Sequence, residues 1–265
     1  MILNDKVAVV YGAGGVIGGA VARRFAREGA TVFLAGRSLA KLEAVAERIT
    51  ESGGRAHVAV VDVLDPSAVT EHVTAVTAGA GKLDIAFNAV GHFHVQGKPL
   101  TELSPSEFEQ PIVEYARSQF AIAQAVTRPM IERRSGVLLV LSTPGARRGY
   151  PGVLGFGTAC AAIEGLTRHL ACELGPHLVR VVCLRPDAIP ETVELGSHAR
   201  RVFEPVAERA GLKLEQMLHP STSTSVLGRY PRLEEVAAAA AFAASDQAGA
   251  MTGAVLNLTC GSDFD

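Results

Sequence analysis

Four side chains mark the part of this chain where chemistry is expected. Residues 142–160 place the hydroxyl of Thr143 thirteen residues before Phe156, and Phe156 four residues before the thiol of Cys160. A phenol, Tyr115, precedes them in a stretch of helical period. Threonine and tyrosine hydroxyls can orient or protonate a substrate oxygen, whereas a phenylalanine ring has no proton to give. Thr143 and Tyr115 are therefore the candidate residues for holding a substrate oxygen, and Phe156 cannot protonate one.

A glycine-rich turn stands near the start of the chain. Gly12, Gly14 and Gly18 follow the apolar run 6–11 and open a stretch of helical period, with Ile17 among them. Glycines allow unusual φ values and a close approach of the backbone, so a pyrophosphate can lie against free N–H groups at a helix N-terminus. Because a strand precedes the turn and a helix follows it, the pattern predicts a dinucleotide site.

The residue types at the end of the second apolar run indicate which of the two nicotinamide cofactors binds. Arg37 and Ser38 stand there, at the place where a carboxylate would accept hydrogen bonds from the adenosine ribose and repel a 2′-phosphate. An arginine binds such a phosphate through its fork of N–H groups. We therefore expect NADP (NADPH) rather than NAD. The alternative is that Arg37 is a solvated residue at the start of a helix.

Short β-branched runs alternate with longer Ala-rich stretches of helical period. Such alternation predicts βαβ units that build a parallel sheet with helices on both faces. The expected fold is α/β, a Rossmann-type doubly wound seven-stranded parallel sheet in a single domain over residues 1–265. The predicted strands are 6–11, 31–35, 56–61, 83–88, 136–142, 179–184 and 254–258. Among the predicted helices are 105–133, interrupted near Pro111 and Pro129, then 152–174 and 233–244.

Residues 191–228 interrupt this alternation. They follow the sixth predicted strand and contain two amphipathic stretches, 197–210 and 212–218, before a Ser/Thr-rich connector at 221–225. Open α/β sheets bind ligands above the carboxyl ends of their strands, where this insertion would lie. We expect a substrate lid, with a plain surface excursion as the alternative.

These motifs together resemble the short-chain dehydrogenase/reductase family over nearly the whole chain. Gly12, Ile17 and Gly18 match its glycine turn, although Tyr11 replaces its usual threonine. The other matches follow the third, fourth and sixth predicted strands, at Asp62, Val63, Asn88, Gly91, Pro186 and Ile189. The resemblance implies that these residues bind the cofactor, with Asp62 and Val63 beside the adenine.

The positions that carry catalysis in that family are all changed here. Its serine, tyrosine, lysine and asparagine correspond to Thr143, Phe156, Cys160 and Tyr115. The resemblance implies that ordinary carbonyl reduction is impaired, because a positioned acid is worth about 10²–10⁴ in rate. We hypothesise that Tyr115 replaces the lost hydroxyl. The alternative is a half-buried aromatic ring that fills space.

Two functions are compatible with these residues. The first is a divergent NADP-dependent oxidoreductase that reduces a carbonyl, an imine or an activated double bond without the usual Tyr/Lys pair. The second is a dinucleotide-binding protein of the same fold without redox turnover, either a non-redox enzyme or a regulatory subunit. His92 and His94, at the rim of the expected pocket, can titrate near neutrality, although lone loop histidines are usually only solvated.

Composition limits the partners of the protein. A formal net charge of −2 disfavours nucleic-acid binding, which depends on clustered cations. No basic leader and no bilayer-length apolar run is present, so we expect a cytoplasmic protein without membrane contact. The four cysteines lack metal-like spacing, and we expect neither a metal site nor a disulfide. The helix at 152–174 is apolar on more than one face. In the family that the chain resembles such helices pair between subunits, so the resemblance implies a homodimer or homotetramer acting on a small molecule.

Overall fold

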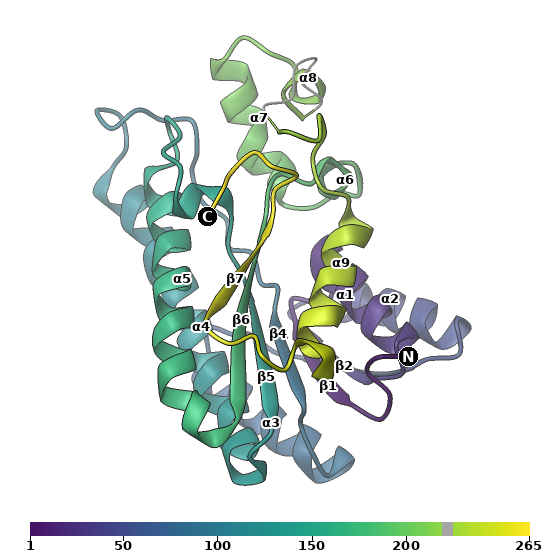
Figure 1. Cartoon of the computed structure of the whole chain (residues 1–265). Helices are drawn as coiled ribbons and strands as arrows, with labels where there is room; N and C mark the ends of the chain where they lie inside the picture. Colours follow the sequence, from purple (N-terminus) through teal and green to yellow (C-terminus); the bar gives the residue numbers. More distant parts are fainter. Residues whose placement is uncertain (219–224) are drawn as a thin grey trace.

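The computed structural model describes residues 1–218 and 225–265. Its centre is one seven-stranded sheet in the order β3-β2-β1-β4-β5-β6-β7 (Figure 1). All neighbouring strands are parallel, which confirms the predicted doubly wound fold. The strands are β1 (Val7–Tyr11), β2 (Thr31–Gly36), β3 (Arg55–Val60), β4 (Ile85–Asn88), β5 (Gly136–Leu141), β6 (Val179–Pro186) and β7 (Ala254–Leu258). The order reverses between β1 and β4, so a crevice is expected there at the carboxyl ends of the strands.

Helices cover both faces of the sheet (Figure 1). Helices α1, α2 and α9 pack together on one face, and α3, α4 and α5 pack together on the other. Their bounds are α1 (Val16–Arg27), α2 (Leu39–Glu51), α3 (Pro66–Ala80), α4 (Pro105–Arg133), α5 (Leu154–Leu174) and α9 (Leu233–Ala244). Among the described residues, no helix combines the length and the apolar character that crossing a bilayer requires.

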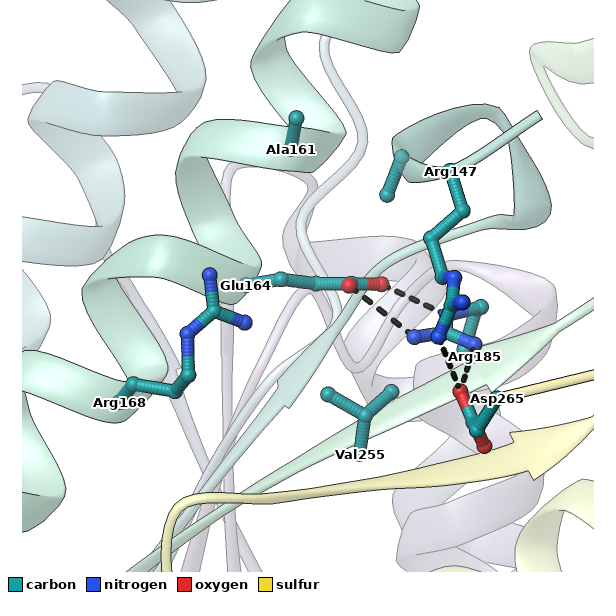
Figure 2. Close-up of a pocket in the computed structure, with 8 residues that line it drawn as sticks. Arg147, Ala161, Glu164, Arg168, Arg185, Val255 and Asp265 are labelled. Atoms are coloured by element: carbon teal, nitrogen blue, oxygen red, sulfur yellow. Dashed lines mark hydrogen bonds and ion pairs between the residues drawn. The ribbon is translucent and has the colours of Figure 1, made fainter. Parts of the chain in front are cut away.

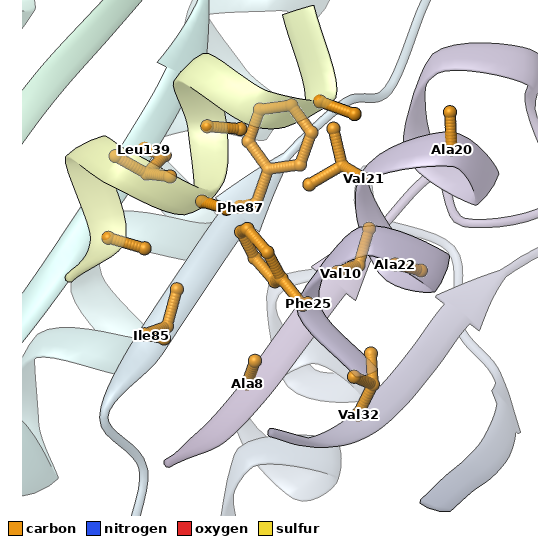
Figure 3. Close-up of a cluster of buried hydrophobic side chains, with 14 of the residues drawn as sticks. Ala8, Val10, Ala20, Val21, Ala22, Phe25, Val32, Ile85, Phe87 and Leu139 are labelled. Carbon is orange, nitrogen blue, oxygen red and sulfur yellow. The ribbon is translucent and has the colours of Figure 1, made fainter. Parts of the chain in front are cut away.

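Each face of the sheet has its own hydrophobic core. On the first face, Phe25 of α1 and Phe87 of β4 pack against Val10 of β1 and the alanines of α9 (Figure 3). Small residues such as Ala240 let α9 approach the sheet closely, and Ala240 is fully buried. The second core includes Tyr11, whose side chain is also fully buried. Dense burial on both faces explains why the central strands are continuous apolar runs.

Helix α4 differs from its prediction. It runs unbroken from Pro105 to Arg133, with Pro111 and Pro129 inside it, so the expected interruptions are wrong. A proline removes one helical hydrogen bond and crowds the carbonyl four residues earlier, but α4 packs closely on α5 along this length. A Cβ atom on Gly155 of α5 would lie 2.7 Å from the carbonyl oxygen of Phe108 and 3.0 Å from the ring of Pro111.

Helix α5 begins at Leu154 rather than at residue 152. Gly152 has φ of +76° and its backbone abuts Gly97. This left-handed conformation is incompatible with a helical start.

In its described residues, the insertion after β6 forms three short helices beyond the carboxyl ends of the strands (Figure 1). They are α6 (Pro190–Glu194), α7 (Ala199–Arg209) and α8 (Leu214–Leu218). The insertion contacts the loop after β4, where Arg209 binds Glu102 at 2.8 Å and the ring of His198 covers Gly91. Most of the predicted connector at 221–225 lies outside the described residues.

Candidate active site

The glycine turn after β1 has the geometry of a phosphate cradle. Gly12 has φ of +77°, and a Cβ atom on it would lie 2.8 Å from the carbonyl carbon of Ala89. A Cβ atom on Gly18 would collide with the carbonyl of Gly12. Helix α1 begins with Gly15 at its N-cap and no side-chain cap, so its first N–H groups remain available for an anion. Ile17 packs half-buried against the core beside the turn.

Three polar side chains surround the start of α2. Arg37 and Ser38 are exposed, and Ser38 occupies the N-cap without a capping hydrogen bond. Arg37 forms no hydrogen bond or ion pair within the described part of the chain. The sequence analysis missed Lys41, whose Cβ would lie 3.0 Å from a Cβ atom on Gly14. A basic residue in the first turn after Ser38 was the signal that could have identified it.

The remaining predicted cofactor residues line the loops after β3, β4 and β6. Asp62 is exposed, and its Oδ1 accepts a hydrogen bond of 3.0 Å from the Leu64 amide. Val63 is buried, as is Asn88, whose Oδ1 accepts a bond of 3.0 Å from the Val90 amide. Pro186 ends β6, Ile189 is buried at the start of α6, and Gly91 lies beneath His198. The structure therefore places all these residues at the carboxyl edge of the sheet.

Thr143 and Cys160 are in direct contact. The Thr143 hydroxyl donates to the Cys160 Sγ at 3.4 Å. Cys160 is only 2% exposed, and burial raises the pKa of its thiol to about 11. A neutral buried thiol is a poor nucleophile and supplies no positive charge. Of this pair, only the Thr143 hydroxyl can serve a substrate, as an acceptor or as a donor once its proton turns away from Cys160.

Tyr115 lies beside Phe156. The two ring centroids are 5.8 Å apart. The Tyr115 hydroxyl accepts a hydrogen bond of 3.2 Å from the His92 amide and donates one of 3.5 Å to the His92 carbonyl. Burial raises the pKa of Tyr115 well above its usual range. The phenol therefore stays protonated at physiological pH, and its donated bond is long and weak.

The structure buries both loop histidines, whereas the sequence left open whether they titrate at the rim of the pocket or are only solvated. His94 stacks on Phe156 with a centroid distance of 4.0 Å. Its Nδ1 lies 2.9 Å from the His92 carbonyl and its Nε2 lies 2.9 Å from Gln96 Nε2. Burial lowers the pKa of His94 to about 4.

His92 is held in the same way, because its Nε2 lies 3.1 Å from the Ser118 hydroxyl and its Nδ1 lies 3.4 Å from a Glu114 carboxylate oxygen. Burial lowers the pKa of His92 as well. Near neutral pH both rings are uncharged, so neither is a ready acid.

Sequence reasoning also missed a buried ion pair behind this site. Arg185 on β6 binds Glu164 on α5 with distances of 2.7 and 3.1 Å, and the Ser142 hydroxyl donates to the same carboxylate at 2.8 Å. One charged residue in an apolar strand and one in an apolar helix were the signal that could have suggested this pair. Within the described part of the chain, no group of three or more potential metal ligands converges.

Comparison with known proteins gives consistent matches over the whole chain. A family model described as enoyl-(acyl carrier protein) reductase matches residues 12–263. The short-chain reductase protein NovJ of Streptomyces niveus is 31% identical over 260 residues, which cover 98% of this chain and 95% of the relative. Peroxisomal 2,4-dienoyl-CoA reductase of Rattus norvegicus is 30% identical over 263 residues, covering 98% and 85%.

A solved structure shows the same fold. The crystal structure of NAD+-bound xylitol dehydrogenase superimposes with a TM-score of 0.83 at 28% identity, covering 98% of this chain and 100% of that chain.

Proposed function

The chain belongs to the short-chain dehydrogenase/reductase family of oxidoreductases, and from that premise we propose that it uses NADPH to reduce a carbon–carbon double bond conjugated to a carbonyl group. The observation that carries the proposal is the pairing of two neutral hydroxyls, Thr143 and Tyr115, with an aromatic ring, Phe156, where a proton donor is expected. Such a site can hold an oxygen, but its phenol is a weak acid because burial raises the pKa of Tyr115.

Reduction of an isolated carbonyl requires a different site. Hydride addition to the carbonyl carbon generates an alkoxide, which must receive a proton from a positioned acid. Phe156 has no proton, and the Cys160 thiol has a pKa raised to about 11. The nearby ring of His94 is neutral near pH 7 and has partners at both nitrogens. The only remaining candidate acid in this set is Tyr115, and burial raises its pKa and makes it a weaker acid than an ordinary phenol.

Reduction of a conjugated double bond fits these residues better. A bound dinucleotide would supply a hydride to the β-carbon, and the negative charge would then develop on the carbonyl oxygen. Hydrogen-bond donors that remain protonated stabilise such an oxygen, and the raised pKa of Tyr115 keeps it a donor. Turning the phenol from the His92 carbonyl toward substrate breaks only a bond of 3.5 Å. Water then protonates the α-carbon, which balances the reaction.

Two of the matches support this reaction class, while other relatives are named as levodione reductase and 3-oxoacyl-[acyl-carrier-protein] reductase. The matching family model carries the description of an enoyl reductase, and one relative is named as a 2,4-dienoyl-CoA reductase. Both names refer to reduction of a double bond conjugated to a carbonyl group.

The proposed cofactor is NADPH rather than NADH. Gly12 and Gly18 leave a cradle that any Cβ atom would fill, which suits a pyrophosphate. Arg37 and Lys41 carry two positive charges beside the uncapped N-terminus of α2, where a 2′-phosphate would lie. The NAD+-bound xylitol dehydrogenase shows that relatives of this fold bind NAD as well, so the choice rests on these side chains.

Two further expectations accompany this function. We propose that residues 191–228 act as a lid, since α7 and the residues before it contact the loop that carries Gly91 and His92. We also propose a homodimer or homotetramer, because α4 and α5 leave Val113, Phe120 and Leu154 at least 42% exposed. Gel filtration that gives a monomer mass would contradict the second expectation.

A matched substrate pair tests the reaction. We expect NADPH consumption and a saturated product with 2-cyclohexen-1-one, and no turnover with cyclohexanone. Tyr115→Phe and Thr143→Val should each lower kcat by about 10²–10³, the usual effect of losing one oxyanion donor, with NADPH affinity unchanged. Tyr150→Phe is the control, because this phenol is 38% exposed in a loop. Turnover of cyclohexanone that is comparable with turnover of the enone would refute the proposal.

The same residues also support a second candidate function. Phe156 and the neutral Cys160 also suit a protein that binds the dinucleotide without redox turnover. Tight NADPH binding without consumption on enones, ketones and imines would establish this alternative, whereas absence of dinucleotide binding would remove both functions.

A further inference from the structure

A second pocket lies behind the candidate active site, between α5, the loop after β5 and the strand β7. Its volume is about 550 Å³. Three of its lining residues are arginines, Arg147, Arg168 and Arg185, while Ala161 and Val255 provide an apolar lining (Figure 2). It is separate from the glycine turn and from the start of α2.

The inner wall of this pocket is the buried ion pair between Arg185 and Glu164. Arg185 is 2% exposed and donates two hydrogen bonds to Glu164. Glu164 also accepts the Ser142 hydroxyl. Removing one partner of a buried pair is strongly destabilising because it leaves an uncompensated charge. We therefore regard Glu164 and Arg185 as a fixed part of the pocket, with one Arg185 nitrogen left for another anion.

A carboxylate of the chain itself occupies that remaining position. Oδ1 of Asp265 lies 2.6 Å from Nη1 of Arg185 and 3.0 Å from Nη1 of Arg147. This arrangement is how two arginines bind a carboxylate or phosphate ligand. The Asp265 side chain is 50% exposed and that of Arg147 is 43% exposed, whereas Arg185 is only 2% exposed. The exposed pair with Arg147 therefore contributes little, and Arg185 is the main partner that a ligand would have to take over from Asp265.

Arg168 supplies a positive charge that the chain does not use. It lies on α5 across the pocket from Arg147, with Glu164 between them (Figure 2). Its side chain is exposed, and it forms neither a hydrogen bond nor an ion pair with any residue that the structure describes. When Asp265 moves away, the pocket lining carries three guanidinium groups and one carboxylate, that of Glu164. A further carboxylate, that of Asp263, stays 3.5 Å from Arg185.

We propose that this pocket binds a small polyanion, a polycarboxylate or an organic phosphate with at least two anionic groups. One anionic group replaces the Asp265 carboxylate on Arg185 and Arg147, and a second binds Arg168. The hydrocarbon part of the ligand lies on Ala161 and Val255. Asp265 is thus an internal competitor whose carboxylate mimics the ligand.

Binding at this pocket is connected to the dinucleotide cleft through the segment that carries Asp265. In the same segment, the Ser262 hydroxyl donates to Asp187, which directly follows Pro186, and the Ser262 carbonyl accepts from Arg148. Displacing Asp265 therefore loosens a segment that contacts the edge of the cleft.

Calorimetric titration of the full chain tests this proposal, with citrate as the polycarboxylate and inorganic phosphate as a single anionic group, both at constant ionic strength. Saturable citrate binding is expected, tighter than phosphate binding. Arg168→Gln should weaken citrate binding by about 10- to 100-fold, the effect of one charge-assisted hydrogen bond. Asp265→Asn should tighten it by up to about fivefold, since an exposed ion pair competes with the ligand.

Arg128→Gln is the matched control, because Arg128 is also an exposed helical arginine without a partner in the described residues. Equal citrate affinity in wild type and Arg168→Gln would overturn the proposal, as would an Asp265→Asn variant that binds no more tightly. A change in gel-filtration mass on Arg168→Gln would instead assign Arg168 to a contact between copies and would also overturn it. NADPH affinity, measured separately, tests the proposed function independently of this pocket.

Discussion

Acid should destabilise this protein through one buried histidine on α3. His72 is 8% exposed, and its Nδ1 lies 3.3 Å from the Tyr11 hydroxyl. Its Nε2 is buried without a hydrogen-bond partner among the described residues. Burial lowers the pKa of His72 from 6.5 to about 4, because a charged ring cannot be solvated between the helix and the sheet.

The sign of the effect follows from proton binding. Between pH 6.5 and pH 4 the unfolded chain binds a proton at His72 and the folded chain does not, so stability falls as the pH falls through this range. With 1.36 kcal/mol per pKa unit, the full loss approaches roughly 3 kcal/mol, and about 2 kcal/mol of it is reached by pH 5. Above pH 7 the ring is neutral in both states and contributes no pH dependence.

A double variant isolates this contribution. Tyr11→Phe with His72→Leu removes the titrating ring and its hydroxyl partner together, so no buried polar atom is left unpaired. Urea unfolding at pH 7.5 and pH 5.0, at fixed protein concentration, should show that wild type loses about 2 kcal/mol more than the variant. The other buried histidines are common to both proteins and cancel. Equal losses in the two proteins would refute the assigned burial of a neutral His72.

Three further predictions concern the cleft. Arg37→Ala should raise the Kd for NADPH by about 10- to 100-fold, the effect of one charge-assisted hydrogen bond, and leave the Kd for NADH unchanged. Fluorescence titrations measure both constants, and an equal rise for NADH would contradict the 2′-phosphate assignment. Cys160 should react with a thiol reagent far more slowly than the exposed Cys172, as peptide mapping can show, and comparable labelling would mean that Cys160 is accessible. Phe156→Tyr combined with Cys160→Lys should gain carbonyl reduction by about 10²-fold or more, measured with cyclohexanone, and a double variant that folds but stays inactive on the ketone would argue against the assigned positions.

The sheet and the glycine turn were predictable because they depend on local patterns. Each buried strand is a short apolar run, and the turn needs a left-handed residue at Gly12. The arrangement of α4 was not predictable in this way, because its packing on α5 maintains the helix through Pro111 and Pro129. The position of Lys41 was also not predictable from local patterns. Its closeness to Gly14 depends on how α2 packs against the glycine turn.

The sequence by itself determined the order of strands and helices, the glycine turn, and the residue types at Thr143, Phe156 and Cys160, because these are properties of neighbouring residues. Only the tertiary structure decided the protonation state and the reactivity of the side chains around them. Burial between α4 and α5 makes the Cys160 thiol inert, keeps the phenol of Tyr115 protonated and removes the charge from His94. Burial depends on the packing of segments far apart in the chain, and it sets the cost of forming a charge.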